Sequence, residues 1–348
     1  MSQSPSDSYQ ATHCRYAIFL PVRNGADYLR QAIDSVLNQS INDWLLIVLD
    51  NASSDGSAEI ASSYDEPRIQ VYKSERALTI FESWHRIWSL LDERLIQAEF
   101  MTIIGHDDVY KTNFLSDMDA LQKSNPSAGL YQSAFNLIDK EGRLIRPCKP
   151  IPSHETSADF LSSRAWGLRD SFGTGYVFRV ADYLRMGGMP DLPNLIFSDD
   201  LLFARLAKHG GKVSSEEVAC EYRLHRGSTS GALSATSMRA VIAGLFAYLQ
   251  YLKLEFPAYW DSSRGRTATA CLIAREALIF RSPCLRWALP DHLKNQLTTL
   301  VSLYEECSSG IKSDQWLGSN FLARKVYPAA RKSLWFVALI REYFVRSV

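Results

Sequence analysis

The sequence has no long apolar run and no excess of charge of either sign. Its 348 residues include 38 Lys and Arg against 38 Asp and Glu, so the formal net charge is zero. This balance predicts no nucleic acid partner, and any basic surface must be local. No stretch of about eighteen consecutive apolar residues predicts a transmembrane helix. Residues 1–13 are polar and lack the apolar stretch of a signal peptide, so we expect a cytoplasmic protein.

Cysteine motifs and glycine-rich phosphate loops are also missing. The six cysteines follow no CxxC or zinc-type spacing, and we expect free thiols in a reducing compartment. The absence of G-x-G-x-x-G disfavours a dinucleotide-dependent dehydrogenase. The absence of a basic, glycine-rich phosphate loop likewise disfavours a nucleotidyltransferase.

What is present is an alternation of short apolar runs with amphipathic helical patterns. Residues 27–39 and 80–91 carry apolar side chains at helical spacing, and a further helix is expected to begin near Ala58. The alternation predicts a parallel, doubly wound α/β sheet with right-handed crossovers. The runs expected to form its strands are residues 16–20, 44–49, 68–73 and 100–104.

Two of these expected strands lead into acidic residues. Asp50 ends the second, and Asp107 and Asp108 follow the fourth. The carboxyl ends of parallel strands line the crevice where open α/β sheets bind ligands, so these carboxylates are expected to share a site. Adjacent carboxylates repel each other, and a Mg²⁺-type ion holding a nucleotide diphosphate would satisfy them. A solvated loop, and an Asx turn at Asp50, remain as alternatives.

The pattern changes after an expected helix at residues 113–123. An antiparallel hairpin is expected around a turn at residues 139–142. Residues 171–178 predict a strand whose glycines allow close approach to the backbone. Ser198, Asp199 and Asp200 are expected to open a helix, and residues 218–224 to form a strand.

Residues 236–348 read as mainly helical. We therefore expect a flexible tail at 1–14, a catalytic domain at 15–235 and a C-terminal helical region at 236–348. Residues 323–348 mix basic and aromatic side chains. They predict either a helix lying on an anionic membrane surface or a helix packed on the core, and periodicity alone does not decide between them.

Five segments taken together resemble motifs of the family 2 glycosyltransferases, which have the GT-A fold. The resemblance covers residues 15–232. One such motif is weak evidence, but five in the right order are specific. The segments are residues 18–25 (IFLPVRNG) with the helix ending in SVLNQS, 49–57 (LDNASSDGS), 105–108 (GHDD), 198–200 (SDD) with Leu202 and Arg205, and 222–225 (YRLH).

The resemblance implies a donor site, a metal site and a catalytic base. Asp107 would hold Mn²⁺ or Mg²⁺ with Asp108 in support, and His225 would meet the metal or the diphosphate. Asp200 would be the general base, with Asp199 standing where the family usually has Glu. The residues implied to bind the nucleotide sugar are Pro21, Val22 and Asn24 around the nucleobase, Asp50 at the base or ribose, Arg68 beside the base, and His106 with Asp107 in the metal-binding region.

The sequence departs from the family pattern at two positions. Gly105 stands where the metal-binding motif has its first acid, and Asn51 replaces a frequent second Asp. A purely structural role also stays open for three of the candidate residues. Asp199 and Asp200 would favour a helix dipole by their position alone, and His225 could be a hydrogen-bonded, partly buried imidazole.

The expected function is therefore that of a metal-dependent, inverting glycosyltransferase. It would move a sugar from a UDP- or dTDP-linked donor to a glycan or lipid-linked acceptor at the cytoplasmic membrane face. The expected context is bacterial cell-surface polysaccharide synthesis, such as O-antigen, capsule or lipopolysaccharide. The alternative is a catalytically silent GT-A domain acting as a nucleotide-binding or scaffold subunit, which the missing acid at Gly105 motivates.

Overall fold

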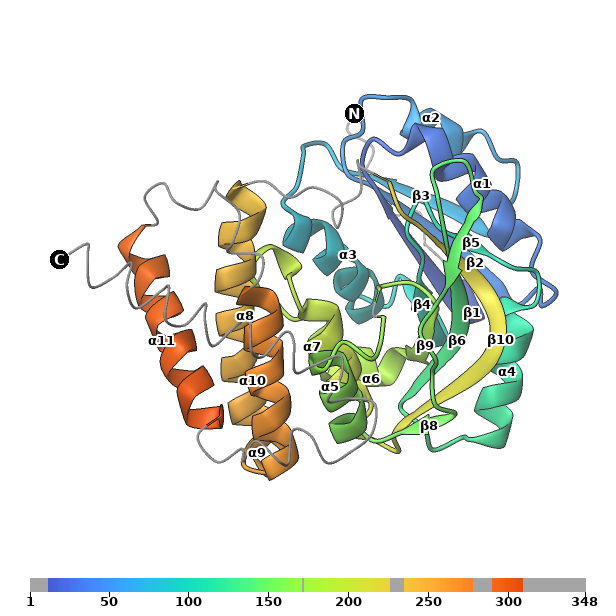
Figure 1. The fold of residues 1–348 in the computed structure, drawn as a ribbon. Helices are drawn as coiled ribbons and strands as arrows, with labels where there is room; N and C mark the ends of the chain where they lie inside the picture. Colours follow the sequence, from blue (N-terminus) through green and yellow to red (C-terminus); the bar gives the residue numbers. More distant parts are fainter. Residues whose placement is uncertain (1–11, 171, 226–234, 278–289, 309–348) are drawn as a thin grey trace. The chain divides into compact units, whose positions relative to one another are not determined.

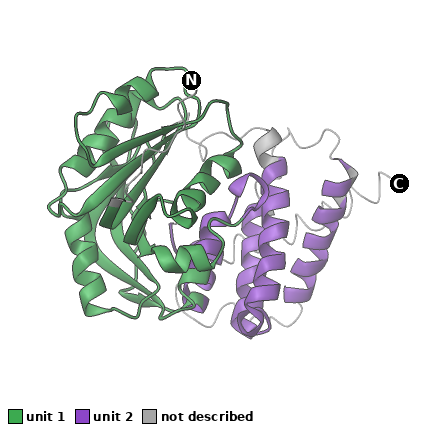
Figure 2. Cartoon of the chain, turned by 180° about the vertical axis from the view of Figure 1, so that it is seen from behind, with its two compact units in different colours: residues 1–157, 172–190, 205–225 green, residues 158–171, 191–204, 226–348 purple. Residues whose placement is uncertain are grey.

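The computed structural model describes residues 12–170, 172–225, 235–277 and 290–308 (Figure 1). The chain divides into two compact units (Figure 2). The first contains residues 1–157, 172–190 and 205–225, and the second contains residues 158–171, 191–204 and 226–348. The division does not coincide with the expected boundary at residue 235.

The first unit is built on a ten-stranded sheet. Its longest path has the order β3-β2-β1-β4-β9-β6-β10-β5, while β7 pairs with β6 and β8 pairs with β10. The strands are β1 (Thr12–Val22), β2 (Trp44–Asp50), β3 (Ile69–Lys73), β4 (Ile96–Ile103), β5 (Val109–Tyr110), β6 (Leu130–Ile138), β7 (Leu144–Pro147), β8 (His154–Glu155), β9 (Tyr176–Arg179) and β10 (Lys212–Arg223).

The pairing confirms the predicted α/β architecture with a mostly parallel core. The run β3-β2-β1-β4 is parallel throughout, and β6 pairs in parallel with β10. The predicted hairpin is present as the antiparallel pair β6 and β7. The segment 171–178 forms a strand only from Tyr176 onward. Gly175, with φ of +88°, holds a conformation that breaks the extended run before it.

Helices cover both faces of this sheet (Figure 1). They are α1 (Ala26–Leu37), α2 (Ser57–Ser62), α3 (Ile80–Asp92), α4 (Phe114–Ser124) and α6 (Val180–Arg185). Because side chains alternate along a strand, Ile18 and Leu20 join a core with α1 and α4, whereas Ala17 and Phe19 point to the other face. There α3 packs on β1 and β4, and α6 packs on β4.

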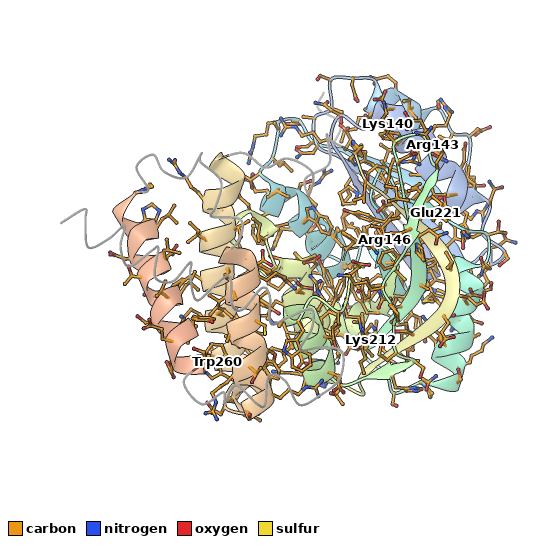
Figure 3. All side chains as sticks on the ribbon, viewed as in Figure 1. Lys140, Arg143, Arg146, Lys212, Glu221 and Trp260 are labelled. Atoms are coloured by element: carbon orange, nitrogen blue, oxygen red, sulfur yellow. The ribbon has the colours of Figure 1, made fainter. Side chains whose placement is uncertain are left out.

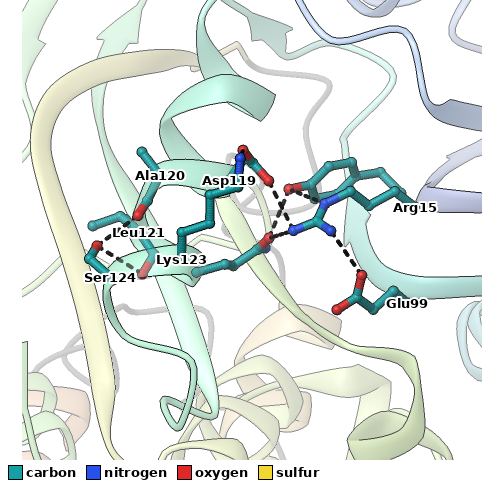
Figure 4. Close-up of polar contacts among 9 residues, drawn as sticks. Arg15, Glu99, Asp119, Ala120, Leu121, Lys123 and Ser124 are labelled. Atoms are coloured by element: carbon teal, nitrogen blue, oxygen red, sulfur yellow. Dashed lines mark hydrogen bonds and ion pairs between the residues drawn. The ribbon is translucent and has the colours of Figure 1, made fainter.

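The amino-terminal edge of the sheet is closed by its own polar side chains (Figure 4). Arg15 pairs with Glu99 at 3.0 Å and with Asp119 at 2.9 Å, joining β1 to β4 and α4. The Tyr16 hydroxyl donates to Gln122 Oε1 at 2.8 Å. The two acids of this group, Glu99 and Asp119, are therefore both paired with Arg15.

The second unit is helical. Phe160 on α5 packs edge-on against Phe203 on α7, and Phe197 stacks on Tyr248 of α8. These contacts explain why residues 158–171 and 191–204 group with the C-terminal helices. The elements are α5 (Ser157–Ala165), the 3₁₀ turn η1 (Pro193–Leu195), α7 (Ser198–Leu206), α8 (Ala235–Glu255), α9 (Pro257–Trp260), α10 (Ser263–Ala277) and α11 (Asp291–Ser308).

Four further expectations concern membrane-spanning helices, the cysteines and the two ends of the chain. In the described ranges, no helix combines the length and apolarity needed to cross a membrane. Cys14, Cys220, Cys271 and Cys307 are free thiols, as predicted. The strand β1 begins at Thr12, inside the expected tail. The predicted helix within 323–348 lies outside the described residues and stays a prediction.

Candidate active site

The loops that follow β1 and β2 are joined side by side at the carboxyl edge of the sheet. Val22 and Asp50 are register partners at the ends of these two strands. Asn24, with φ of +53°, accepts a hydrogen bond from the Ser54 amide at 2.9 Å through its side-chain oxygen. The Gly25 amide donates to Ser57 Oγ at 3.0 Å. The two motifs thus form one continuous rim.

Asp50 is the buried acid of this rim, at 2% exposure. Its Oδ2 accepts a bond from the Ser53 amide at 3.3 Å, while Oδ1 has no hydrogen-bond partner among the described residues. Arg86 from α3 donates to the Asp50 backbone oxygen at 2.9 Å. A buried carboxylate oxygen without a partner is rare in folded proteins. Here it provides an acceptor for a ligand hydroxyl or amide.

Asp107, in the turn after β4, faces His225, which follows the end of β10. The Asp107 Oδ2 and the His225 Nε2 are 2.8 Å apart, and both side chains keep about one sixth of their surface exposed, at 15% and 17%. The imidazole also lies against the ring of Tyr28, with 5.2 Å between ring centres. This carboxylate and imidazole, 118 residues apart in sequence, present donor atoms at one place.

Asp108 is held differently from its neighbour. It is 2% exposed, its Oδ1 accepts a bond from the Arg223 amide at 3.0 Å, and its Oδ2 accepts one from the Thr174 hydroxyl. Burial, reinforced by the charge of Asp107, raises the pKa of Asp108 to about 7. Both oxygens are engaged with protein donors. These bonds anchor the turn, and the support of a metal ion by Asp108 stays a prediction.

Two glycines allow the acids and His106 to pack as they do. A Cβ at Gly25 would lie 2.2 Å from the His106 ring, so this imidazole rests directly on the loop after β1. Burial lowers the pKa of His106. A Cβ at Gly105 would lie 2.7 Å from Asp108 Oδ2 and 2.8 Å from Asp107 Oδ1. A side chain at position 105 would therefore require these two carboxylates to shift.

Arg223 ties the turn to its surroundings. It is 2% exposed, and its Nε donates to the Asp107 backbone oxygen at 2.8 Å. Its Nη2 donates to Gln31 Oε1 on α1 at 2.7 Å, and its Nη1 donates to the Asp139 backbone oxygen at 3.1 Å. One guanidinium therefore connects the acidic turn, helix α1 and the β6–β7 hairpin.

Asp107 and His225 fit a divalent cation whose remaining ligands come from a bound substrate and water. Among the described residues there is no cluster of three or more metal-ligating side chains. Asp107 and His225 supply two ligand groups in contact. Mg²⁺-type ions are bound through one or two carboxylates together with substrate phosphates and water, rather than by a cage of protein ligands. Asp107 and His225 are the residues that would hold such an ion.

The second unit contains the other acid pair, in the first turn of α7. Arg164 donates from Nε and Nη2 to the two carboxylate oxygens of Asp200, each at 2.7 Å. Arg275 in turn donates to the Arg164 backbone oxygen at 2.6 Å. The paired bonds fix the carboxylate's orientation. They leave acceptor positions free, since a carboxylate has about four lone-pair sites.

Asp199 is expected to make stability depend on pH. Burial and the adjacent charge of Asp200 raise its pKa to about 7. The folded chain therefore keeps this proton at pH values where the unfolded chain has lost it, and stability falls as the pH rises from about 4 to 7. Asp199→Asn removes this titration and still offers an oxygen to the Asp200 amide, which Asp199 bonds at 2.8 Å.

Thermal unfolding at pH 5 and pH 8 checks this expectation. From pH 5 to pH 8 the thermal unfolding midpoint of the wild type should fall more than that of Asp199→Asn. The difference between the two falls should be several degrees. Parallel shifts in the two proteins would contradict the assignment.

The structure brings eight of the predicted site residues to the carboxyl edge of the first unit's sheet or to the loops that follow it, but not Arg68. Arg68 precedes β3, bonds Glu66 at 2.9 Å and lies over the Trp44 ring at 4.0 Å. Lys73 is the register partner of Asp50, so Arg68 lies five residues, roughly 16 Å, from that edge. The eight residues are Pro21, Val22, Asn24, Asp50, His106, Asp107, Asp108 and His225.

Val22 reaches this edge through its backbone alone. Its side chain is 3% exposed and belongs to the core, while its carbonyl accepts a bond from the Asn51 amide at 2.9 Å. Sequence reasoning missed Thr174, Arg223 and Arg164 as partners of the acids. Only Arg223 carried a signal, because it stands two residues before His225 in the last motif.

Comparison with known proteins gives one matching family model, glycosyl transferase family 2, over residues 17–180. An uncharacterized glycosyltransferase of Rickettsia conorii is 30% identical over 143 residues, which are 40% of this chain and 22% of the relative. The chain thus spans less than a quarter of that relative's length. A putative teichuronic acid biosynthesis glycosyltransferase, TuaG of Bacillus subtilis, is 22% identical over 69% of this chain and 89% of its own.

Two solved structures resemble the chain at low identity. S. aureus TarS 1–349 in complex with UDP-GlcNAc has a TM-score of 0.53 at 14% identity, covering 86% of this chain and 93% of that one. The mannosyltransferase PcManGT of Pyrobaculum calidifontis, in complex with GDP-Man and Mn²⁺, has a TM-score of 0.51 at 14% identity, covering 93% and 88%. At these identities the likeness establishes the fold, and it confirms the predicted GT-A type.

Proposed function

We propose that the protein transfers a sugar from a nucleotide-diphosphate donor to an acceptor hydroxyl, a proposal that starts from the match of residues 17–180 to glycosyl transferase family 2. The reaction is metal-dependent and inverts the anomeric configuration. The observation that carries the proposal is the carboxyl edge of the first unit's sheet. There Asp50, whose Oδ1 has no partner among the described residues, follows β2, and Asp107, paired with His225, follows β4, on the other side of β1.

Asp50 and the Asp107–His225 pair would contact different parts of a nucleotide diphosphate. Asp50 accepts hydrogen bonds from the base or ribose, beside the rim that Asn24 joins to Ser54. Asp107 and His225 would hold Mn²⁺ or Mg²⁺, which supplies positive charge to stabilise the departing diphosphate. The TarS and PcManGT structures hold UDP-GlcNAc and GDP-Man, which supports a nucleotide-sugar donor.

The acceptor must lose a proton as its oxygen attacks the anomeric carbon. Asp200 takes this proton as general base, and Arg164 fixes the orientation of its carboxylate through two bonds of 2.7 Å. Asp199 stands beside it in the first turn of α7. One in-line displacement of this kind inverts the configuration at the anomeric carbon.

The acceptor is proposed to be a glycan or a lipid-linked sugar in cell-surface polysaccharide synthesis. The name of TuaG, a teichuronic acid biosynthesis glycosyltransferase, supports this context. We propose that the donor is a UDP- or dTDP-linked sugar. Sugar transfer would take place in the cytoplasm, at the inner face of the membrane. The proposal includes peripheral contact with the membrane through residues 323–348.

A panel of nucleotide sugars tests the activity, with nucleotide-diphosphate release as the readout. Calorimetry with UDP and Mn²⁺ tests the site itself. We expect UDP binding that requires the metal and that Asp107→Ala weakens. Metal-dependent binding without turnover of any donor would favour a silent nucleotide-binding subunit. A Cβ at position 105 would require the carboxylates of Asp107 and Asp108 to shift, which favours glycine there.

A further inference from the structure

The turn before α7, residues 194–197, holds three non-glycine residues in the left-handed region. Asn194, Leu195 and Phe197 have φ of +52°, +55° and +66°. Asparagine tolerates this conformation, but for large side chains such as leucine and phenylalanine it is rare and costly. Such conformations persist only where the surrounding structure enforces them, and they gather at functional sites. The turn leads directly into α7 and its acid pair.

Phe197 fixes the place where α7 begins. The helix starts at Ser198, and the Leu201 amide donates to the Phe197 backbone oxygen at 3.0 Å. Phe197 is therefore the flanking residue whose carbonyl accepts the first bond of the helix. Because Asp200 is the third residue of α7, the direction of its side chain follows from the conformation of Phe197.

Helix α8 contacts this turn at two places. The Tyr248 ring stacks on the Phe197 ring, with 5.2 Å between ring centres. One helical turn earlier, a Cβ at Gly244 would lie 2.8 Å from the Ile196 Cβ and 3.2 Å from the Ile196 backbone oxygen. Glycine weakens the interior of a helix, and here it lets α8 approach the turn closely. Gly244 and Tyr248 are four residues apart and so share one face of α8.

Helix α8 is itself held by the rest of the second unit. It packs on α9, α10 and α11, and Trp260 of α9 is buried (Figure 3). The carboxylate of Asp200 is held separately, by Arg164 of α5, which Arg275 of α10 bonds in turn. Asp200 is thus fixed at its carboxylate through α5 and α10, and at its backbone through the turn and α8. The family match ends at residue 180, so α8 lies outside it.

We propose that Gly244 and Tyr248 are positioning residues for Asp200. They hold the turn in its strained conformation, and the turn sets the direction in which α7 presents the Asp200 carboxylate to the acceptor hydroxyl. This role rests on the proposed function, in which Asp200 takes the acceptor proton. Neither Gly244 nor Tyr248 is assigned a contact with the reacting atoms. A helix outside the matched region would thereby control the rate of sugar transfer.

Gly244→Ala tests the close approach of α8 to the turn. Alanine favours a helix more than glycine does, so α8 itself should not weaken, but the new Cβ must displace Ile196. We expect kcat for nucleotide-diphosphate release to fall about 10- to 100-fold, because misplacing a catalytic group by about 1 Å costs rates of this order. The KM for the donor and metal-dependent UDP binding should stay at wild-type values, since Asp50, Asp107 and His225 belong to the first unit.

Tyr248→Leu and Tyr248→Phe test the ring contact. Leucine removes the ring that stacks on Phe197 and should lower kcat, whereas phenylalanine keeps the ring and should retain the wild-type kcat. An equal loss in both variants would assign the effect to the hydroxyl and overturn the role of the ring. Hydrogen exchange over residues 192–201, which needs no substrate, should become faster in Gly244→Ala and in Tyr248→Leu. Unchanged exchange in both would show that α8 does not hold the turn.

Leu252→Ala is the matched control on the same helix. Leu252 is 3% exposed and lies eight residues, about 12 Å, beyond Gly244. Its loss should lower the thermal unfolding midpoint but leave kcat unchanged at temperatures where the chain is folded. Wild-type kcat in Gly244→Ala and Tyr248→Leu, or losses of kcat that follow the midpoint in all α8 variants, would overturn the positioning role alone. A wild type that turns over no donor would contradict the proposed function, and the positioning role with it.

Discussion

A chain carrying Asp200→Asn is expected to transfer sugar about 10²- to 10⁴-fold more slowly than the wild type. Asparagine has the shape of aspartate and keeps one oxygen for Arg164, but it cannot take the proton of an attacking hydroxyl. The measurement is the rate of nucleotide-diphosphate release with donor and acceptor both present. Affinity for UDP should stay unchanged, because the residues proposed to hold the nucleotide and metal lie in the other unit.

Arg164→Lys tests the contribution of Arg164 separately from that of the proposed base, Asp200. Lysine keeps the charge but cannot form the two parallel bonds that Arg164 makes to Asp200. We expect a smaller loss of kcat than in Asp200→Asn, with little change in KM for the donor. Both variants should be checked by thermal unfolding, because Asp200→Asn leaves the half-buried Arg164 less well paired. Turnover in Asp200→Asn close to that of the wild type would remove the base assignment.

The sequence predicted those site residues whose position follows from their own strand. Asp50 stands at the end of an apolar run, and such a run in an alternating α/β pattern forms a parallel strand with its last residue at the ligand-binding edge. Asp107 follows β4 for the same reason. The same rule places Arg68 at the opposite edge, because it precedes its strand. The family resemblance had suggested a position for it that the strand direction does not allow.

The partners of these acids could not be predicted in the same way. Thr174 bonds Asp108 across 66 residues, and Arg223 bonds Asp107 across 116. No periodicity connects positions that far apart. The role of a single glycine such as Gly105 can be recognised only when the atoms near the position of its missing Cβ are known. Likewise, residues 158–171 and 191–204 join the C-terminal helices through contacts such as Arg164 with Arg275 and Phe197 with Tyr248. A boundary drawn along the sequence at residue 235 cannot show this.

The other large effect is expected from Arg223→Met, which should lower the free energy of unfolding by about 3–5 kcal/mol. Methionine fills much of the volume beside Tyr28 but donates no hydrogen bond. The backbone oxygens of Asp107 and Asp139 and the Oε1 of Gln31 would lose their donor. The buried carboxyl of Asp108 would also lose a neighbouring positive charge that lowers its pKa against the effect of burial. Urea unfolding followed by circular dichroism measures the loss.

Arg143→Met is the matched control for this prediction, because it removes the same charge from a side chain that is 73% exposed in the same hairpin. Its effect should stay within about 0.5 kcal/mol, as for most surface substitutions. Equal effects of the two variants would show that the buried contacts of Arg223 contribute little. If Arg223 holds the acidic turn in place, Arg223→Lys should weaken metal-dependent UDP binding even at temperatures where the chain stays folded. A purely structural role would leave that affinity at the wild-type value.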